Sequence, residues 1–382
     1  MGDRHGVDSV VPWDALTLED RRLEFAALAA SKGVSVSELC RRFGISRKTG
    51  YKWLERHAAG EPLSDRSRKP LSSPKKAPEE LEARVLKVRS EHPAWGGRKI
   101  RAVLLAQGLG SPSPSGITEI LRRNGKLDGP GAGEKRDWER FEREAPNELW
   151  QMDFKGHFEL ADQSRCHPLT VLDDHSRYSL LTLACRNERA QTVKAALEGV
   201  FRVHGLPGEI LCDNGGCWGG GETGLNEITV WLLRLGIQAK HGKPYHPQTQ
   251  GKLERFHRTL KAEALQGPLP KDMAGCQKRL DRFRTDYNAL RPHEELGMKP
   301  PSSRYKPSLR AFPERLPEPE YAPDCRIRKV QQGGIVHFQG WEIRVSQCLV
   351  GLPVGLRLAG QDGRYDVLFC AHKVAEVDLK AQ

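Results

Sequence analysis

The sequence contains no long apolar run. None of its segments reaches the roughly 18 consecutive apolar residues that a membrane-spanning helix needs, although the chain has 382 residues. The first 20 residues also lack the basic and apolar regions of a secretory signal peptide. We therefore expect no membrane association and a cytoplasmic location.

Cysteines in a spacing that would suggest disulfides or zinc sites are also missing. The nine cysteines are scattered singly, and only Cys212 and Cys217 lie close together. No histidines or cysteines surround that pair at zinc-finger spacing. We expect reduced thiols rather than a disulfide framework or structural zinc.

Acidic residues are outnumbered by basic ones. The chain has 61 Lys and Arg against 49 Asp and Glu, a net charge of +12. Such an excess favours a polyanionic partner, of which nucleic acid is the commonest. The alternative is a soluble basic protein without such a partner. A chain of this length is expected to fold as about two to four domains.

A helix-turn-helix DNA-binding domain is predicted over residues 20–58. Leu23 and its helical neighbours give a first helix an apolar face, and Ser35 opens a capping box for a second. Gly44 ends that helix in a tight turn. Ser46 caps a third helix over residues 47–57. Helix, glycine-containing turn and helix form the pattern of this motif.

The third helix is predicted to be the recognition helix of this domain. Its inward face is expected to hold Tyr51 and Leu54, which turns the basic side chains outward. The residues that we expect to contact DNA are Arg47, Lys48, Lys52 and Arg56. The alternative is an ordinary three-helix core with a solvated basic face.

Two further segments precede the largest domain. Residues 59–78 form a basic, proline-rich linker, either laid along a phosphate backbone or serving as a solvated spacer. Residues 79–127 carry three more apolar helical stripes and are predicted to be a second helix-turn-helix-like domain. A polar, glycine-rich linker follows.

Alternating strands and helices predict a layered α/β core over residues 145–299. Its first three strands are expected to be antiparallel. The predicted strands are 149–160, 167–173, 178–185, 209–213 and 237–241, and the predicted helices are 188–204, 225–235, 248–265 and 273–290. After a proline-rich stretch, five short strands with glycine turns predict a small SH3-like β-barrel over residues 321–378.

Three acidic residues of the core are the candidate catalytic groups. Asp153 alternates with the apolar Met152 and Phe154, so it occupies the opposite face of its strand. Asp213 ends another strand, where ligand groups collect in layered α/β folds. Glu254 lies in the first turns of a helix. Oxygen ligands of this kind suit Mg²⁺ or Mn²⁺ rather than zinc, and two such ions can activate a nucleophile and stabilise the leaving oxygen of a phosphodiester.

The sequence around these acids resembles the integrase catalytic core of DDE transposases, and most closely the insertion-sequence 481 family of bacteria. The matching segments are LWQMDF at 149–154, LDDHSRY at 172–178, CDNG at 212–215, PYHPQTQGKLERFHR at 244–258 and RPHEELG at 291–297. The interval between Asp213 and Glu254 (254 − 213 = 41) is somewhat long, with the extra residues placed in 217–223. The zinc module of retroviral integrases is absent, and the helix-turn-helix units take its place.

The resemblance implies an RNase H-like core and a DNA transposase that cleaves at transposon ends and transfers the 3′-hydroxyl into target DNA. It makes Asp153, Asp213 and Glu254 the metal ligands for two Mg²⁺ ions, with Mn²⁺ as a substitute. The implied partners are the terminal inverted repeats and the target DNA. Synapsis of two ends implies a homo-oligomer, bound to the bacterial nucleoid when on DNA. The alternatives are a non-transferring nuclease on the same fold and a domesticated DNA-binding regulator.

Other charged residues near the motifs have more ordinary interpretations. Asp173 and Asp174 are interpreted as turn and cap groups, salt-bridged to Arg177, rather than as catalytic acids. His246 is assigned either a contact with DNA or the active site, or a loop-packing role. Arg258 and Lys261 share a helical face with Glu254 and are expected to bind phosphates beside the cut bond. The alternative is an exposed ion pair.

Overall fold

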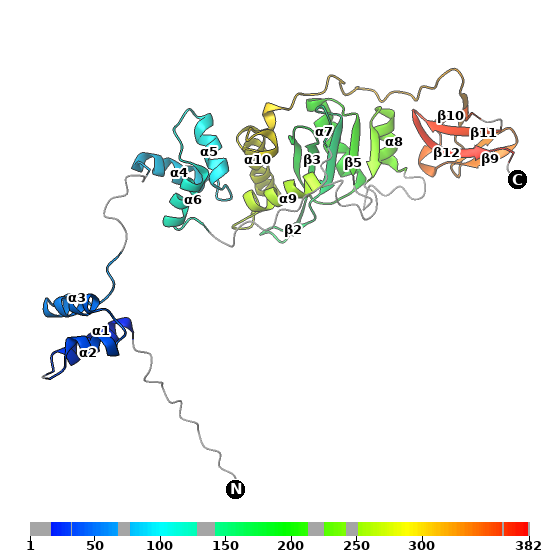
Figure 1. Ribbon diagram of the computed structural model, residues 1–382. Helices are drawn as coiled ribbons and strands as arrows, with labels where there is room; N and C mark the ends of the chain where they lie inside the picture. Colours follow the sequence, from blue (N-terminus) through cyan, green and yellow to red (C-terminus); the bar gives the residue numbers. More distant parts are fainter. Residues whose placement is uncertain are drawn as a thin grey trace, which may run out of the picture. The chain divides into compact units, whose positions relative to one another are not determined.

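The computed structural model describes seven segments of the chain (Figure 1). They are residues 17–31, 33–67, 77–127, 142–212, 225–241, 251–360 and 363–380. The chain separates into two compact units, Met1–Lys76 and Ala77–Gln382.

The first unit is a small three-helix domain. Its helices are α1 (Leu18–Ala29), α2 (Val36–Arg42) and α3 (Arg47–Ala58). Phe25, Leu39 and Cys40 form its buried centre. The Ser46 side chain accepts a hydrogen bond from the backbone N–H of Thr49, which confirms the predicted cap of α3. The second predicted cap was wrong, because the Ser35 side chain makes no capping hydrogen bond.

The predicted inward face of α3 was also wrong in part. Tyr51 is 58% exposed, whereas Trp53 is 5% exposed and Gly50 is buried. A Cβ atom on Gly50 would lie 2.5 Å from the Sγ atom of Cys40, so the glycine permits a close approach that turns this side of α3 inward. In α1, likewise, Phe25 and Ala26 are buried and Leu23 is 53% exposed.

The second unit begins with another helical group. Its helices are α4 (Glu79–Glu91), α5 (Gly97–Ala106) and α6 (Pro114–Arg123). All three predicted stripes contribute to one buried cluster, which Trp95 joins from the turn before α5. The buried members are Val85, Val88, Trp95, Ile100, Leu104, Ile117, Ile120 and Leu121.

A six-stranded mixed sheet forms the centre of the second unit. The strands are β1 (Leu149–Phe154), β2 (Phe158–Glu159), β3 (Arg165–Asp173), β4 (Ser179–Cys185), β5 (Glu209–Cys212) and β6 (Gln238–His241). The order is β2-β3-β1-β5-β6, with β4 paired to β3. The β1–β3 and β3–β4 pairs are antiparallel as predicted, and the β1–β5 and β5–β6 pairs are parallel. The strand predicted over 149–160 is divided between β1 and β2, with the left-handed Gly156 between them.

Helices cover both faces of this sheet (Figure 1). They are α7 (Ala190–His204), α8 (Glu227–Arg234), α9 (Gly251–Glu263) and α10 (Met273–Ala289). Trp150 and Met152 of β1 pack in one buried cluster with α7 and α8. Leu172 of β3 packs in another with α9 and α10. The result is the predicted layered α/β core, because each face of the sheet has its own apolar cluster.

The C-terminal strands form two antiparallel sheets. The strands are β7 (Arg326–Lys329), β8 (Ile335–Phe338), β9 (Trp341–Arg344), β10 (Pro353–Leu358), β11 (Arg364–Phe369) and β12 (His372–Asp378). The order β12-β11-β10-β7 makes one sheet, and β8 pairs with β9 in the other. Pairing of the described strands does not close them into the predicted barrel. Strand β12 was not predicted, because its turn uses the left-handed Cys370 rather than a glycine.

No helix in the described segments is long and apolar enough to cross a membrane.

Candidate active site

Asp153 lies near the end of β1 on the face that carries α9. Its neighbours Trp150 and Met152 are completely buried on the other face. The Asp153 side chain is 25% exposed, so its carboxylate is accessible from solvent. In the antiparallel register Asp153 pairs with Thr170 of β3. Alternation along β1 therefore places the acid where the sequence predicted it.

Glu254 lies in the first turn of α9 and is exposed. Leu253, Phe256 and Leu260 of the same helix are buried in the cluster against the sheet. This confirms the apolar stripe expected beside Glu254. The packing of α9 on the sheet thus leaves Glu254 at the surface, beside the apolar face of the helix.

His257 connects α9 to the strand of Asp153. Its Nδ1 atom lies 4.0 Å from Oδ2 of Asp153, and its Nε2 atom lies 2.8 Å from the Thr170 hydroxyl. Burial, and then the nearby charge of Lys155, lower the pKa of His257 to about 4, so the ring is neutral at pH 7. Glu254 lies three residues before His257, one helical turn away. The structure therefore brings the helix of Glu254 against Asp153.

Asp213 and His246 lie outside the described residues. Asp213 directly follows β5, the parallel neighbour of β1. Within the described segments, no three His, Cys, Asp or Glu side chains are grouped so that they could hold a metal ion. Asp153 and Glu254 nevertheless offer carboxylate oxygens from two adjoining elements, and hard divalent cations prefer such ligands. This donor set fits Mg²⁺ or Mn²⁺ and does not resemble a zinc site.

Positive charge gathers beside Asp153. Lys155 follows it by two residues, and the pKa of Lys155 is lowered by burial and by the charge of Lys261 on α9. Arg258 and Lys261 are both exposed. In contrast, Arg255 on the same helix forms an ion pair with Glu295 at 3.6 Å. Lys155 was not singled out from the sequence, because only the packing of α9 on β1 brings it close to Lys261.

Asp173 is a turn group, as the sequence indicated. Its Oδ1 atom accepts hydrogen bonds from the backbone N–H and the hydroxyl of Ser176, at 2.8 and 2.5 Å. Its Oδ2 atom accepts one from the backbone N–H of Asn147 at 2.7 Å. Burial nevertheless raises the pKa of Asp173 above its ordinary value, and these hydrogen bonds oppose the shift.

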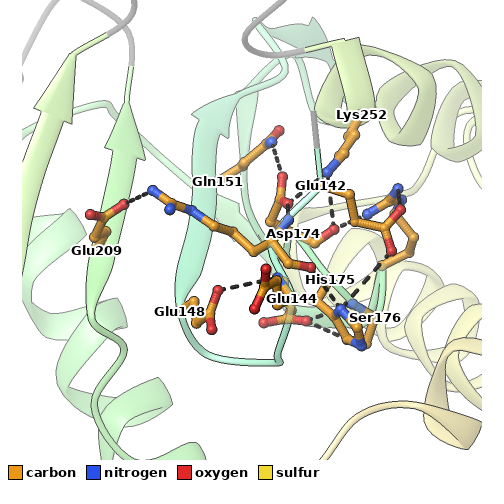
Figure 2. Close-up of polar contacts among 12 residues, drawn as sticks. Glu142, Glu144, Glu148, Gln151, Asp174, His175, Ser176, Glu209 and Lys252 are labelled. Carbon is orange, nitrogen blue, oxygen red and sulfur yellow. Dashed lines mark hydrogen bonds and ion pairs between the residues drawn. The ribbon is translucent and has the colours of Figure 1, made fainter. Parts of the chain in front are cut away.

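Asp174 has a different partner from the one predicted. Its carboxylate forms an ion pair with Lys252 of α9 at 2.6 Å, rather than with Arg177 (Figure 2). Arg177 instead donates to the backbone carbonyl of Asp174 and forms an ion pair with Glu142. Burial, and then the charge of Arg177, lower the pKa of Lys252. The sequence interpretation missed this pair, since the partners are far apart in the chain.

The candidate DNA contacts of the first unit differ in exposure. Arg47, Lys48 and Lys52 are exposed. The Arg56 side chain is 13% exposed and donates a hydrogen bond to the carbonyl of Ser64. Tyr51 is exposed among the three outward cations, although the sequence placed it inside.

Several protein families match successive parts of the chain. A helix-turn-helix domain family matches residues 21–70, and a homeodomain-like family matches residues 49–121. Two integrase core domain families match residues 143–247 and 235–301. The C-terminal domain of IS481 family transposases matches residues 325–382.

Similar proteins include two from bacterial insertion elements. An uncharacterized 31.7 kDa protein of insertion element IS407 from Burkholderia multivorans is 26% identical over 230 residues, which cover 59% of this chain and 80% of the relative. An uncharacterized 39.2 kDa protein of insertion element IS476 from Xanthomonas euvesicatoria is 25% identical, covering 70% of this chain and 72% of the relative.

Solved structures with weaker similarity include retroviral integrases. One is the simian T-cell lymphotropic virus intasome in complex with a PP2A regulatory subunit, at 17% identity and a TM-score of 0.36, covering 76% of this chain and 99% of that one. Another is the HTLV-2 integrase catalytic core domain in complex with magnesium, at 15% identity and a TM-score of 0.33, covering 43% and 99%. The chain thus has the succession of domains of an IS481 family transposase, with N-terminal helix-turn-helix domains, an integrase core and the C-terminal domain of that family.

Proposed function

We propose that the chain is a DDE transposase in which Asp153, Asp213 and Glu254 hold two Mg²⁺ ions, for which Mn²⁺ can substitute. The contact of His257 with Asp153 carries this proposal, because it places the helix of Glu254 against the strand of Asp153. Asp213 directly follows β5, the strand beside β1, in the sequence. Asp153 and Glu254 thus belong to two adjoining elements of one layered core, and Asp213 comes next in the chain after a third.

The chemistry is phosphodiester cleavage at the transposon ends, followed by transfer of the 3′-hydroxyl into target DNA. Paired divalent ions activate the attacking oxygen and stabilise the leaving oxygen when they are bound. The carboxylates of Asp153 and Glu254 would hold those ions. Lys155, Arg258 and Lys261 bind the phosphates on either side, since Lys155 follows Asp153 by two residues and lies near Lys261, and Arg258 and Lys261 share an exposed face of α9 with Glu254.

The other domains bring DNA to this site. We assign residues 20–58 and 79–127 to recognition of the terminal inverted repeats, through Arg47, Lys48 and Lys52, with a weaker part for the largely buried Arg56. Residues 59–78 are a linker, residues 145–299 an RNase H-like catalytic core, and residues 321–378 a C-terminal domain of two antiparallel sheets. A homo-oligomer on the bacterial nucleoid pairs two ends in the synaptic complex.

The triad is tested with near-isosteric variants that remove charge without removing volume. Asp153→Asn, Asp213→Asn and Glu254→Gln should each abolish Mg²⁺-dependent cleavage of a duplex that carries the terminal repeat. DNA binding should survive, since the helix-turn-helix domains are unchanged. Glu263→Gln is the matched control, because Glu263 lies at the far end of the same helix α9.

Three results would decide between the candidate functions. Full cleavage by the Glu254→Gln protein contradicts the metal site. Cleavage without joining to target DNA favours a nuclease on the same fold. Specific DNA binding with no cleavage by the unaltered chain, in Mg²⁺ or Mn²⁺, favours a DNA-binding regulator.

A further inference from the structure

The Asp174 carboxylate is completely buried and contacts both β1 and α9, the elements that carry Asp153 and Glu254 (Figure 2). Its Oδ1 atom accepts a hydrogen bond from Nε2 of Gln151 on β1 at 2.8 Å. Its Oδ2 atom lies 2.6 Å from Nζ of Lys252 on α9. The two oxygens of one side chain therefore bind one strand and one helix.

The positions of these two partners are informative. Gln151 precedes Asp153 by two residues, so both side chains lie on the same face of β1. Lys252 precedes Glu254 by two residues in the first turn of α9. Each partner of Asp174 is thus within two residues of a proposed metal ligand.

Asp174 itself is firmly held. Its backbone N–H donates to the carbonyl of Leu149 at the start of β1, at 3.0 Å. Its Oδ2 atom also accepts from the backbone N–H of Arg143 at 2.9 Å. The carbonyl of Asp174 receives a second contact from Nζ of Lys252 at 3.2 Å. The side chain that contacts both elements is therefore anchored by backbone atoms and has little rotational freedom.

We propose that Asp174 is a positioning residue of the active site, which sets the distance between the carboxylates of Asp153 and Glu254 through Gln151 and Lys252. The inference rests on the proposed metal site. The Lys252 side chain is only 17% exposed and its ammonium has two contacts with Asp174. These contacts fix the first turn of α9.

A simple folding role makes a different prediction from a positioning role. Removing one member of a buried ion pair leaves the other charge uncompensated, and this destabilises the fold. Removing both members together restores much of the stability, because no unpaired charge remains. If Asp174 only stabilises the fold, the double variant should bind metal normally. If it positions the acids, metal binding should stay weak after stability has returned.

The experiment measures Mn²⁺ binding to the full chain by electron paramagnetic resonance of the free ion, together with thermal unfolding. The variants are Asp174→Asn, Lys252→Met and the double Asp174→Asn/Lys252→Met. We expect each single variant to unfold at a lower temperature and the double to unfold close to the wild type. All three should bind Mn²⁺ about 10-fold more weakly or worse, the range seen when groups that orient metal ligands are changed.

Two further variants complete the design. Lys252→Arg keeps the positive charge and should bind Mn²⁺ more tightly than Lys252→Met. Glu263→Gln breaks the ion pair between Glu263 and Arg291, at 2.9 Å, at the other end of α9. Both partners of that pair are also mostly buried, with side chains 14% and 10% exposed. Glu263→Gln should therefore lower stability and leave Mn²⁺ affinity unchanged.

The outcomes separate this inference from the proposed function. Wild-type Mn²⁺ affinity in the double variant, with affinity lost in Glu254→Gln, overturns the positioning role and leaves the metal site intact. Unchanged affinity in Glu254→Gln itself refutes the metal site, and the inference falls with it. Weak binding in the double variant with wild-type stability is the result that supports the inference.

Discussion

The His257 ring on α9 is hydrogen-bonded to the Thr170 hydroxyl on β3, with 2.8 Å between Nε2 and Oγ1. Thr170 is completely buried, and its hydroxyl donates to the backbone carbonyl of Asp153 at 3.0 Å. Because the hydroxyl proton is used there, the oxygen accepts from the Nε2–H group of a neutral His257. One hydroxyl thus joins the helix of Glu254 to the backbone of Asp153.

Replacing Thr170 by Val should therefore destabilise the core. Valine has nearly the same shape, but it leaves the buried Nε2–H of His257 without its acceptor. We expect a loss of about 1–3 kcal/mol in the free energy of unfolding, measured by chemical denaturation. Thr170→Ser keeps the hydroxyl and should lose less. Equal losses in the two variants would show that the methyl group, not the hydrogen bond, matters.

The exposed stripe of Arg258 and Lys261 should contribute to binding of the transposon end. Changing both to Glu should weaken binding and lower the slope of log affinity against log salt by up to about two units, one for each lost phosphate contact. Stability should be unchanged, since both side chains are exposed.

Arg255→Gln on the same helix is the control for that stripe. Arg255 is paired with Glu295 at 3.6 Å, so its loss should change the salt slope less. A normal slope and normal strand transfer in the double Glu variant would show that the stripe is only a solvated face.

Tyr51 should contribute to DNA recognition by the first helix-turn-helix. Its side chain is 58% exposed on α3 and stands beside Arg47, Lys48 and Lys52. Tyr51→Ala should weaken binding to terminal-repeat DNA without lowering the stability of the unit, because little apolar area is lost from the core. The measurement is affinity for terminal-repeat and random duplexes at one stated salt concentration.

Trp53 gives the contrasting variant on the same helix. It is 5% exposed, and the Arg22 guanidinium lies 3.8 Å from the centre of its ring. Trp53→Ala should cost about 3–5 kcal/mol and unfold so small a domain. If the Tyr51→Ala protein is as unstable as the Trp53→Ala protein, Tyr51 packs in the core, as the sequence predicted.

Gly205 should be irreplaceable by alanine in the core. It follows α7 with a φ of +75°, and a Cβ atom there would lie 2.6 Å from the carbonyl oxygen of Ser308. Gly205→Ala should lower the free energy of unfolding by about 1–3 kcal/mol. The alanine strains the backbone at this positive φ, and its Cβ atom pushes against the segment that contains Ser308. Gly199→Ala is the control, because nothing lies within 4 Å of its added Cβ atom. Thermal unfolding of both proteins provides the comparison.

The sequence alone determined the helical N-terminal region and most of the α/β core. Strand alternation placed Asp153 opposite Trp150 and Met152, and helical periodicity placed Leu253, Phe256 and Leu260 on one face of α9. Both patterns are local and follow directly from the geometry of a strand and a helix. The motifs around the acids were specific enough to indicate the family before the fold was known.

Only the tertiary structure decided which polar side chains meet. Asp174 and Lys252 are separated by 78 residues, and no periodicity links them. Their pairing depends on how α9 packs across the sheet. The face of α3 was likewise decided by packing, because Gly50 lets that helix approach Cys40 closely and turns Tyr51 outward. Local sequence patterns determine on which face of a strand or helix a side chain lies. Which side chain of another strand or helix it contacts depends on long-range packing, and one sequence does not reveal that packing.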